Sequence, residues 1–463
     1  MKKGYLTVFL AMSLGFLTAF ILMLTAGAVY NAEKLRLECA ADTGMNAVLS
    51  EFHRGLYDRY GLLYVDAAYR GEAPLLSNVE RRLQYYIEQN TAAVLERKYA
   101  PWGKLSEIQA AVTGVQTAAY GNGASMRHQA VLYAEDTGLR REEEKVFSCR
   151  AEIEALQAAQ PMEAFDAVMA ELSAIELPRI LNEKGILEEV PLANPADWVY
   201  GLTGSDALYL AEAELTECSP VSVELDKVLS HRERLTEEQE QDREFRREEE
   251  LFFSFLFEKM SYYRGAKPGT LLTAQIEYLI CGENSDFKNM SGVADKLLRI
   301  RFADNLRLAL QDEGLMGQAL VAADQLQAVS LKQELRKPVA VSILYACAFL
   351  ETIGDLRTIY GGGRIPIQKS SHQMSVEKVL GGSQYKTADQ DGFSYSDYLA
   401  AMLLLVQEEE LNLKVMDLME MDICFRDGES GFHMDYCIER LEGEITACGS
   451  RTTFHVKRKY GYF

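Results

Sequence analysis

The sequence predicts an α+β fold that is mainly helical. An N-terminal transmembrane helix is expected to extend into a long soluble helix, and a helical C-terminal region is expected to end in an antiparallel β-hairpin. Three observations predict this fold. An uncharged apolar run opens the chain, apolar residues recur at three and four positions over most of its length, and the segment from Phe432 onward partly alternates between apolar and polar residues.

The apolar run from Tyr5 to Tyr30 predicts a membrane-spanning helix. Its 26 residues include no Asp, Glu, Lys, Arg or His, and Lys2 and Lys3 precede it. A helix of this length would extend about 39 Å, more than the roughly 30 Å hydrocarbon core of a bilayer. The alternative is a cleaved secretory signal, for which Ala26-Gly27-Ala28 offers the small residues of a cleavage site. A signal core is normally about 7–15 residues long, so the run favours a retained anchor.

Residues 31–230 predict an α/β region that follows the membrane run. Apolar positions continue at helical spacing from Leu35 to Leu56, so one long helix is expected to leave the membrane and pack on a soluble domain. Residue periodicity and turn residues predict strands at 61–66 and 108–120, and helices at 77–96, 126–135, 142–159 and 162–174. Three prolines between 177 and 205 predict an irregular segment.

The tract 231–250 is predicted to connect this region to a C-terminal region, residues 251–463. It holds nine acidic residues and five arginines in twenty positions. Such a composition is typical of a solvated helix or a flexible connector, and the alternative is an acidic interaction tract.

The C-terminal region is predicted to be helical until its last segment. Apolar spacing predicts helices at 251–263, 270–281, 293–311, 318–335, 339–360 and 395–422. The glycines at 361–363 and Pro366 would end the helix that begins at Val339. A terminal hairpin would then pair residues near 432–441 with 452–463, with Gly443 or Gly449 near its turn.

The acidic charge of the chain excludes one class of function. The formal charge is −21 and the pI is about 4.9. Phosphate binding needs basic clusters, so a protein that binds nucleic acid through its overall charge is excluded. Residues 1–30 hold two lysines and no acid, so the other 433 residues carry 46 basic and 69 acidic groups, a charge of −23. The soluble part is therefore more acidic than the total suggests.

The cysteines do not identify a metal or redox site. All eight are scattered, with no CxxC pair of the kind that zinc or thioredoxin-like chemistry requires. Cys281 and Cys347 lie in apolar helical patterns, where a thiol behaves as a small hydrophobic group. Cys424, Cys437 and Cys448 are close in sequence, and a disulfide among them is left open, because sequence does not determine the Cα separation.

Known catalytic motifs are absent, and the sequence predicts a protein that is not an enzyme, with no catalytic, cofactor-binding or metal-binding residue. HExxH, GxSxG, GxxxxGK[ST] and GxGxxG do not occur, and the six histidines include no helical pair at i,i+3 or i,i+4. Glu351 and Asp355 are the most notable carboxylate pair, because they share one helical face. We interpret them as part of an exposed face, with Arg357 nearby, and not as a catalytic acid and base.

Glu277 is unusual because apolar residues surround it in sequence. An unpaired charge in such a position would be destabilising. We therefore expect a buried structural ion pair between Glu277 and either Arg299 or Arg301 of the following helix.

Several segments resemble a known family. The leader Lys2-Lys3-Gly4 runs into the apolar helix, which continues through Cys39-Ala-Ala-Asp42 to Tyr57-Asp-Arg-Tyr-Gly-Leu-Leu-Tyr-Val-Asp66. The C-terminal half adds Gln275-Ile-Glu-Tyr-Leu-Ile-Cys-Gly282, the helix from Arg299 to Leu310, Gly361-Gly-Gly-Arg-Ile-Pro366 and Gly392-Phe-Ser-Tyr-Ser-Asp-Tyr-Leu399. The chain resembles a family of single-pass proteins of clostridial-type bacteria that are encoded with tight-adherence (Tad) pilus genes and share the layout of TadE/TadG-like pseudopilins.

The resemblance implies a possible leader cleavage. In type IV-like pilins a prepilin peptidase cuts after a glycine, which would place the cut between Gly4 and Tyr5. Those pilins carry a glutamate five residues into the mature helix, whereas this chain has Phe9 there and no acid anywhere in the apolar run.

Taken with the anchor, the resemblance implies a membrane-anchored structural or assembly component of a Tad-type pilus or secretion system. Its domains would be a cytoplasmic tail (1–4), a transmembrane helix in the bilayer (5–30) and an extracytoplasmic remainder, so that it crosses the cytoplasmic membrane once with the N-terminus inside. Its partners would be pilus subunits or pilus assembly proteins. The alternatives are an anchored extracellular adhesin or ligand-binding module and a membrane-tethered hydrolase.

Overall fold

The computed structural model describes residues 2–71, 73–95, 105–139, 144–216, 218–233, 246–382 and 387–462. The chain forms two compact units, and each combines stretches that are distant in sequence. Unit 1 consists of residues 1–138, 227–245 and 415–463, and unit 2 consists of residues 139–226 and 246–414. This division differs from the predicted one into 31–230 and 251–463. The reason is that the C-terminal strands return to the N-terminal helix, so both ends of the chain belong to unit 1.

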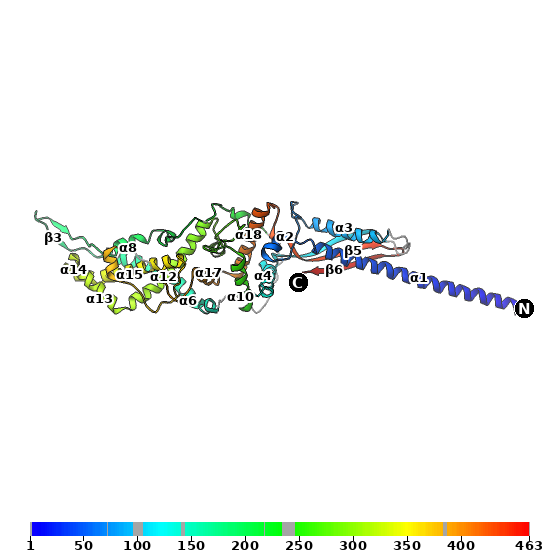
Figure 1. Ribbon diagram of the computed structural model, residues 1–463, viewed down its shortest axis with the longest axis horizontal. Coiled ribbons are helices and arrows are strands. Elements are labelled where there is room, and N and C mark those ends of the chain that lie inside the picture. Colours follow the sequence, from blue (N-terminus) through cyan, green and yellow to red (C-terminus); the bar gives the residue numbers. More distant parts are fainter. Residues whose placement is uncertain are drawn as a thin grey trace. The chain divides into compact units, whose positions relative to one another are not determined.

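Unit 1 contains the long N-terminal helix, as predicted. Helix α1 runs without interruption from Lys2 to Leu49. The unit also contains α2 (Arg54–Tyr60), α3 (Leu76–Leu95), α4 (Tyr120–Asp136) and the later part of α18 (Glu408–Asp427). Figure 1 shows α3 and strands β5 and β6 beside the second half of α1, whose first half extends beyond them to the N-terminus.

A single antiparallel sheet completes unit 1, and β5 (Cys437–Cys448) lies at its centre. Along one edge β5 pairs with β2 (Ser106–Thr117), and along the other it pairs with β1 (Val65–Asp66) and then with β6 (Thr453–Gly461). The predicted terminal hairpin is therefore confirmed, although β5 begins later and ends later than the sequence indicated.

The turn of this hairpin lies at Gly449 and not at Gly443. Gly443 stands within β5, opposite Arg458 of β6, where the helices approach the sheet closely. A Cβ there would come within 3.2 Å of the Met45 sulfur. Gly449 precedes β6, and a Cβ on it would lie 2.6 Å from the Glu33 carboxylate. A side chain at Gly449 would overlap the Glu33 carboxylate and the Phe454 ring, whereas a side chain at Gly443 would require the Met45 sulfur to move by a few tenths of an ångström.

One face of the sheet packs against α1 and α3 to form the core of unit 1. The helices contribute aliphatic side chains at spacings of three and four residues, such as Leu37, Ala41, Met45 and Val48 on α1 and Val79, Leu83 and Ile87 on α3. Strand β5 contributes every second residue, Leu441, Ile445 and Ala447, as the two-residue period of a strand requires. The apolar stripe on the second half of α1 therefore belongs to the core of unit 1.

Unit 2 is almost entirely helical. Its helices are α5 (Glu144–Ser148), α6 (Arg150–Ala158), α7 (Pro161–Ala174), α8 (Asp197–Leu202), α9 (Ala207–Leu210), α10 (Arg246–Lys259), α11 (Gln275–Cys281), α12 (Asp286–Gln311), α13 (Glu313–Asp324), α14 (Gln327–Leu331), α15 (Arg336–Tyr360), α16 (Val376–Gly381), α17 (Tyr395–Leu403) and the start of α18. Helix α15 is long and apolar enough to cross a membrane, but 94% of its most apolar window is buried inside the protein, which identifies it as a core helix.

Several helix boundaries differ from the sequence prediction. The predicted helix 142–159 is divided at Cys149 into α5 and α6, and 395–422 is divided near Leu404 into α17 and α18. The proline-rich segment that was predicted to be irregular contains a two-stranded hairpin, β3 (Arg179–Leu181) with β4 (Leu187–Glu189). Within the tract 231–250, residues 234–245 lie outside the described residues, and α10 begins at Arg246.

Candidate functional site

The first candidate functional surface is the N-terminal half of α1. Every residue from 5 to 24 is exposed on all sides of the helix, including large apolar side chains such as Phe9 and Phe16. A helix that is apolar around its whole circumference needs an apolar environment. Among the described residues, α1 and α15 are the helices long and apolar enough to cross a membrane, and α1 is the one whose apolar window is not buried.

The C-terminal hairpin attaches α1 firmly to unit 1. The Tyr30 ring lies 5.1 Å from the Phe454 ring, and the Glu33 carboxylate accepts hydrogen bonds from the backbone N–H and the hydroxyl of Ser450. Further along, Arg458 Nε lies 2.5 Å from Asp42 Oδ1. Contacts of β6 and its turn are therefore distributed along the soluble half of α1.

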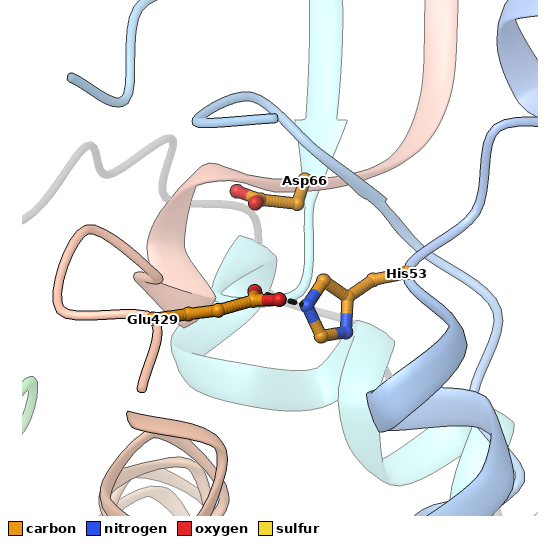
Figure 2. Close-up of side chains that lie close together, drawn as sticks. All are labelled: His53, Asp66 and Glu429. Carbon is orange, nitrogen blue, oxygen red and sulfur yellow. Dashed lines mark hydrogen bonds and ion pairs between the residues drawn. The ribbon is translucent and has the colours of Figure 1, made fainter. Parts of the chain in front are cut away.

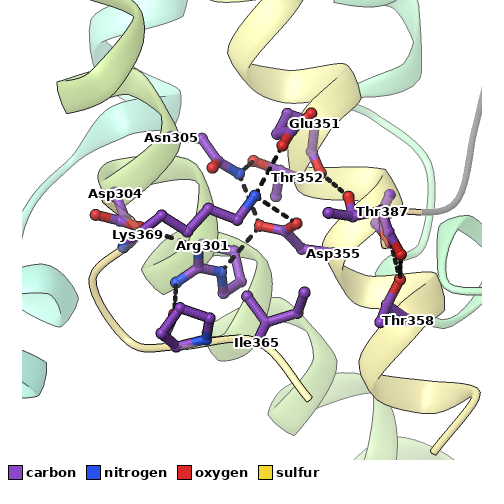
Figure 3. A network of polar contacts seen from close by, with 12 residues as sticks. Arg301, Asp304, Asn305, Glu351, Thr352, Asp355, Thr358, Ile365, Lys369 and Thr387 are labelled. Carbon is purple, nitrogen blue, oxygen red and sulfur yellow. Dashed lines mark hydrogen bonds and ion pairs between the residues drawn. The ribbon is translucent and has the colours of Figure 1, made fainter. Parts of the chain in front are cut away.

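The second candidate is a cluster of buried charges in unit 2, drawn in Figure 3. Helix α12 places Arg301, Asp304 and Asn305 on one face, and α15 places Glu351 and Asp355 opposite them, one helical turn apart. Lys369, which follows α15 in the chain, lies with its ammonium group between the two α15 carboxylates. Its Nζ is 2.8 Å from Glu351 Oε1 and 2.7 Å from Asp355 Oδ1.

Arg301 joins the two helices at this cluster. Its Nε donates to Asp355 Oδ2 at 3.1 Å and its Nη2 donates to Asp304 Oδ2 at 3.0 Å, while Nη1 donates to the carbonyl oxygens of Pro366 and Ile367. The side chains of the ion-paired residues Arg301, Asp304, Glu351, Asp355 and Lys369 are fully buried. The partly exposed Arg307 also pairs with Asp304, so three cations balance three carboxylates.

The structure contradicts the prediction that Glu351 and Asp355 lie on an exposed face near Arg357. Both are fully buried, and their cationic partners are Lys369 and Arg301, from segments that helical spacing does not connect to α15. Arg357 instead pairs with Glu212. The carboxylates are neutralised and solvent does not reach them. This geometry favours a structural role, because a general acid or base has to contact a substrate.

The partners of Glu277 also differ from those that the sequence predicted. Glu277 is fully buried, as expected, but it makes no ion pair within the part of the chain that the structure describes: Arg299 pairs with Glu163, and Arg301 belongs to the cluster described above. Glu277 Oε1 accepts hydrogen bonds from the Tyr263 N–H and the Tyr395 hydroxyl, both at 2.9 Å. Among the described residues, Oε2 has no hydrogen-bond partner.

Protonation takes the place of the predicted ion pair at Glu277. Burial is the main cause that raises the pKa of Glu277 to about 7, against the lowering effect of its hydrogen bonds. The carboxyl is therefore neutral at mildly acid pH, which removes most of the free-energy penalty of burying it. Arg299 lies on the exposed surface, where it could not have served Glu277.

A cavity of about 270 Å³ lies beside this group. Tyr263, whose N–H binds Glu277, lines the cavity together with Tyr262, Arg264 and Cys218. The Arg264 backbone has a φ of 65°, which is uncommon for a residue with a side chain, and its Nη1 donates to the Tyr360 carbonyl oxygen at 2.5 Å. The lining thus includes two tyrosines, an arginine and Glu214, a set of residues that suits a small polar ligand.

The third candidate is the group His53, Asp66 and Glu429 in unit 1, drawn in Figure 2. Their ligand atoms lie within 4.8 Å of one another, a separation that fits a metal ion. His53 precedes α2, and its Nδ1 accepts the Leu56 N–H at 3.0 Å, while Nε2 lies 2.7 Å from Glu429 Oε2. Burial is the main cause that raises the pKa of Asp66.

The tautomer of His53 argues against a metal at this position. Since Nδ1 accepts a backbone N–H, a neutral ring must carry its proton on Nε2 and donate it to Glu429. A metal on Nε2 would displace that proton and require either an imidazolate or a proton on Nδ1, which would face the Leu56 N–H. The geometry therefore favours a helix cap that is held by Glu429.

A second group of possible metal ligands, Glu420, His433 and Asp435, is occupied by an arginine. Arg232 Nη1 lies 2.5 Å from Glu420 Oε1, and Nη2 lies 2.5 Å from Asp435 Oδ1. Burial alone would raise the pKa of Glu420, but the hydrogen bonds from His433 and Arg232 outweigh it and lower that pKa. A guanidinium so placed provides the positive charge that a cation would bring.

The remaining predicted positions give no chemical site. Gly4 and Tyr5 lie within α1, and cleavage between them stays a prediction. All eight cysteines are among the described residues and each is a free thiol, so the disulfide that was left open for Cys424, Cys437 and Cys448 does not form. Burial raises the pKa of Cys281 to about 11 and that of Cys347 to about 12, which keeps both thiols neutral.

Comparison with known families matches residues 186–449 to the "Family of unknown function (DUF5702)". The match covers more than half of the chain. The chain belongs to the DUF5702 family. The DUF5702 match includes the buried charge cluster, Glu277 and the cavity, and it does not include α1 or β6. No curated protein and no solved structure matches the chain.

Sequence reasoning missed the residues that the fold brings together from distant positions. Lys369 follows the three-glycine segment and carries no motif, and His53 and Glu429 are separated by 376 positions. One signal was available. Helical spacing placed Glu351 and Asp355 on the same face as Ile343, Leu344 and Cys347, which indicates a buried face.

Proposed function

We propose that this protein is a membrane-anchored structural or assembly component of a Tad-type pilus or secretion system. The observation that carries the proposal is the difference between the two halves of α1. Its first half exposes only apolar and small side chains, and its second half is part of the core of unit 1. A helix of this kind can lie in the bilayer or pack against the equivalent helices of neighbouring subunits. In either case it fixes the position of unit 1, because its second half is part of the core of that unit.

The direction of the anchor is part of the proposal. Lys2, Lys3 and the α-amino group lie before the apolar run, and Lys34 and Arg36 lie just past it. This balance slightly favours a cytoplasmic N-terminus, which would leave both units outside the cytoplasmic membrane. The resemblance to proteins encoded with Tad pilus genes supports the choice of partner. The buried and neutralised carboxylates support a role that depends on shape and not on catalysis.

Photo-crosslinking from the apolar half of α1 tests the proposal. A photoreactive amino acid at Phe16, which is 72% exposed, would report what surrounds this helix in cells, and the same group at Tyr209, which is 77% exposed in unit 2, is the matched control. We expect adducts from position 16 with pilus subunits or assembly proteins. Adducts with lipid alone would contradict a role in assembly, and adducts with neither would contradict the anchor.

A second candidate is an anchored ligand-binding module, which the cavity at Arg264 favours. In that case Arg264→Ala should abolish saturable binding of the ligand, and position 16 should crosslink to lipid only. The two functions therefore predict different crosslinking results.

A further inference from the structure

The contact between α1 and the rest of unit 1 begins at a defined position. Residues 5–24 are all exposed, whereas Thr25 and Ala26 are half-buried. The ring of Tyr30 then contacts Phe454, and Glu33 binds Ser450 at the turn of the terminal hairpin. The part of α1 that is free of other protein therefore comprises 20 residues and not the 26 of the uncharged run.

The length of this free part matches the apolar layer of a bilayer. At 1.5 Å per residue, residues 5–24 extend about 30 Å, which is about the thickness of the hydrocarbon core. No residues remain for a spacer between the bilayer and the domain. Tyr30 lies six residues beyond Leu24, or about 9 Å, and the headgroup layer on each side is about 5–7 Å thick.

The turn of the terminal hairpin lies at the end of unit 1 that is nearest the apolar half of α1. Strand β6 runs in the same direction as α1, with Phe454 beside Tyr30 and Arg458 beside Asp42, so the turn before β6 lies at the end of the sheet nearest the apolar half. Ser450, Arg451 and Thr452 are exposed in this turn. Among the described residues, Arg451 has no ion-pair partner, and the nearby Glu33 carboxylate is buried against Ser450.

We propose that the turn at residues 449–452 rests on the lipid headgroups and that Arg451 binds their phosphate groups. The inference rests on the proposed membrane anchor and adds a second contact with the bilayer, made by the soluble unit itself. Arginine suits this position because its guanidinium group pairs well with phosphate. Since the hairpin holds α1 at several points, this contact would hold unit 1 at the membrane surface in one orientation.

Fluorescence quenching by brominated lipids tests the proposal in the full chain. The native tryptophans, Trp102 and Trp198, are replaced by Phe, and a single Trp is introduced by Arg451→Trp or, as the matched control, by Lys459→Trp. Position 459 is also exposed on the hairpin but lies six residues beyond the start of β6, or about 20 Å along the strand. The proteins are placed in phosphatidylcholine–phosphatidylglycerol vesicles whose acyl chains carry bromine near the headgroup.

We expect Arg451→Trp to be quenched several-fold more than Lys459→Trp. Equal and weak quenching of both variants, in protein that still floats with the vesicles, would overturn the headgroup contact and leave the anchor intact. Failure of both variants to float would overturn the anchor and the headgroup contact together.

A charge reversal gives a second measure without an added aromatic ring, which by itself favours the membrane interface. Arg451→Glu should lower the thermal midpoint in phosphatidylglycerol vesicles more than in detergent, whereas Lys459→Glu should change both midpoints equally. An equal effect of Arg451→Glu in the two media would contradict phosphate binding.

Discussion

At the residue scale, the protein accommodates two buried glutamate carboxylates in two different ways. Glu351 forms a buried ion pair with Lys369, whose Nζ lies 2.8 Å from Glu351 Oε1. Glu277 has no cationic partner among the described residues and is partly protonated at neutral pH, because burial raises its pKa to about 7. Both lie within the DUF5702 match, yet the sequence around them does not tell them apart. The difference depends on which side chains the neighbouring elements bring near.

Glu277→Gln should therefore change how stability depends on pH. A folded-state pKa of about 7 against 4.5 for a free glutamate means that the wild type loses stability as pH rises between these values. Gln keeps the acceptor for Tyr263 and Tyr395 and does not ionise. Relative to the wild type, the variant should gain on the order of 2–3 kcal/mol between about pH 4.5 and pH 8.

Urea unfolding of the detergent-solubilised chain, followed by circular dichroism across this pH range, measures the change. Glu334→Gln is the control, because Glu334 is 79% exposed and should give a difference that does not vary with pH. A flat difference for Glu277→Gln as well would show that Glu277 ionises normally in the folded protein.

Lys369→Met should be strongly destabilising. It would leave Glu351 and Asp355 buried without their shared cation, and removal of one partner of a buried ion pair typically costs about 3–5 kcal/mol. The matched control is Arg336→Met, which breaks the exposed pair with Asp324 and should cost at most about 1 kcal/mol. Adding Glu351→Gln to Lys369→Met should restore part of the loss. Equal unfolding free energies for the two single variants would contradict the buried network.

At the element scale, side chains of α3 close the free edge of the sheet. Among the described residues, β2 pairs with no strand on the side away from β5. Gln84 instead accepts from the Ala110 N–H at 2.6 Å and donates to the Ile108 carbonyl oxygen at 2.8 Å, and Glu80 accepts from the Val112 N–H. Gln84 thus pairs with β2 as a residue of a neighbouring strand would. An open edge would invite pairing with another chain.

Gln84→Ala should promote self-association through β2. The variant frees one donor and one acceptor on the edge strand, and we expect a larger dimer fraction in sedimentation velocity of the detergent-solubilised chain, with a stability loss of about 1–3 kcal/mol. Asn90→Ala is the control, since Asn90 lies on the same helix and, among the described residues, donates only to the Tyr86 carbonyl oxygen. An unchanged monomer for Gln84→Ala would show that the edge is closed by other means.

At the scale of the whole molecule, the apolar first half of α1 continues directly into unit 1, with no break in the helix between them. The helix is continuous from Lys2 to Leu49, and hydrogen bonds at Glu33 and Asp42 hold it to the hairpin. Removal of residues before Thr25 should therefore change solubility without changing thermal stability, whereas removal that includes Tyr30 should also lower thermal stability.

A chain that begins at Thr25 should be soluble without detergent and should keep the thermal midpoint of the full chain. It lacks the exposed apolar residues but retains Tyr30 and Glu33, and its acid excess favours solubility. A chain that begins at Lys34 loses the contacts of Tyr30 and Glu33 with the hairpin, keeps that of Asp42, and should melt at a lower temperature. Similar midpoints for the two truncated proteins would show that these contacts contribute little.

The sequence by itself determined the local features of this protein. The absence of charge from Tyr5 to Tyr30 is enough to require an apolar environment, and the periods of 3.6 and 2 were enough to predict α1, most helices of unit 2 and the terminal hairpin. These features depend on neighbours in the chain, so a one-dimensional pattern contains them.

Only the tertiary structure decided which distant residues meet. The partner of Glu351 is Lys369, the acceptor for His53 is Glu429, and the contact between α1 and the rest of unit 1 begins at Thr25 and Ala26, inside the uncharged run. Ion pairs and hydrogen bonds act over a few ångströms in space, whatever the separation in sequence. The apolar neighbours of Glu277 in sequence therefore indicated that it is buried, but the position of Arg299 and Arg301 relative to it depends on where α12 places them.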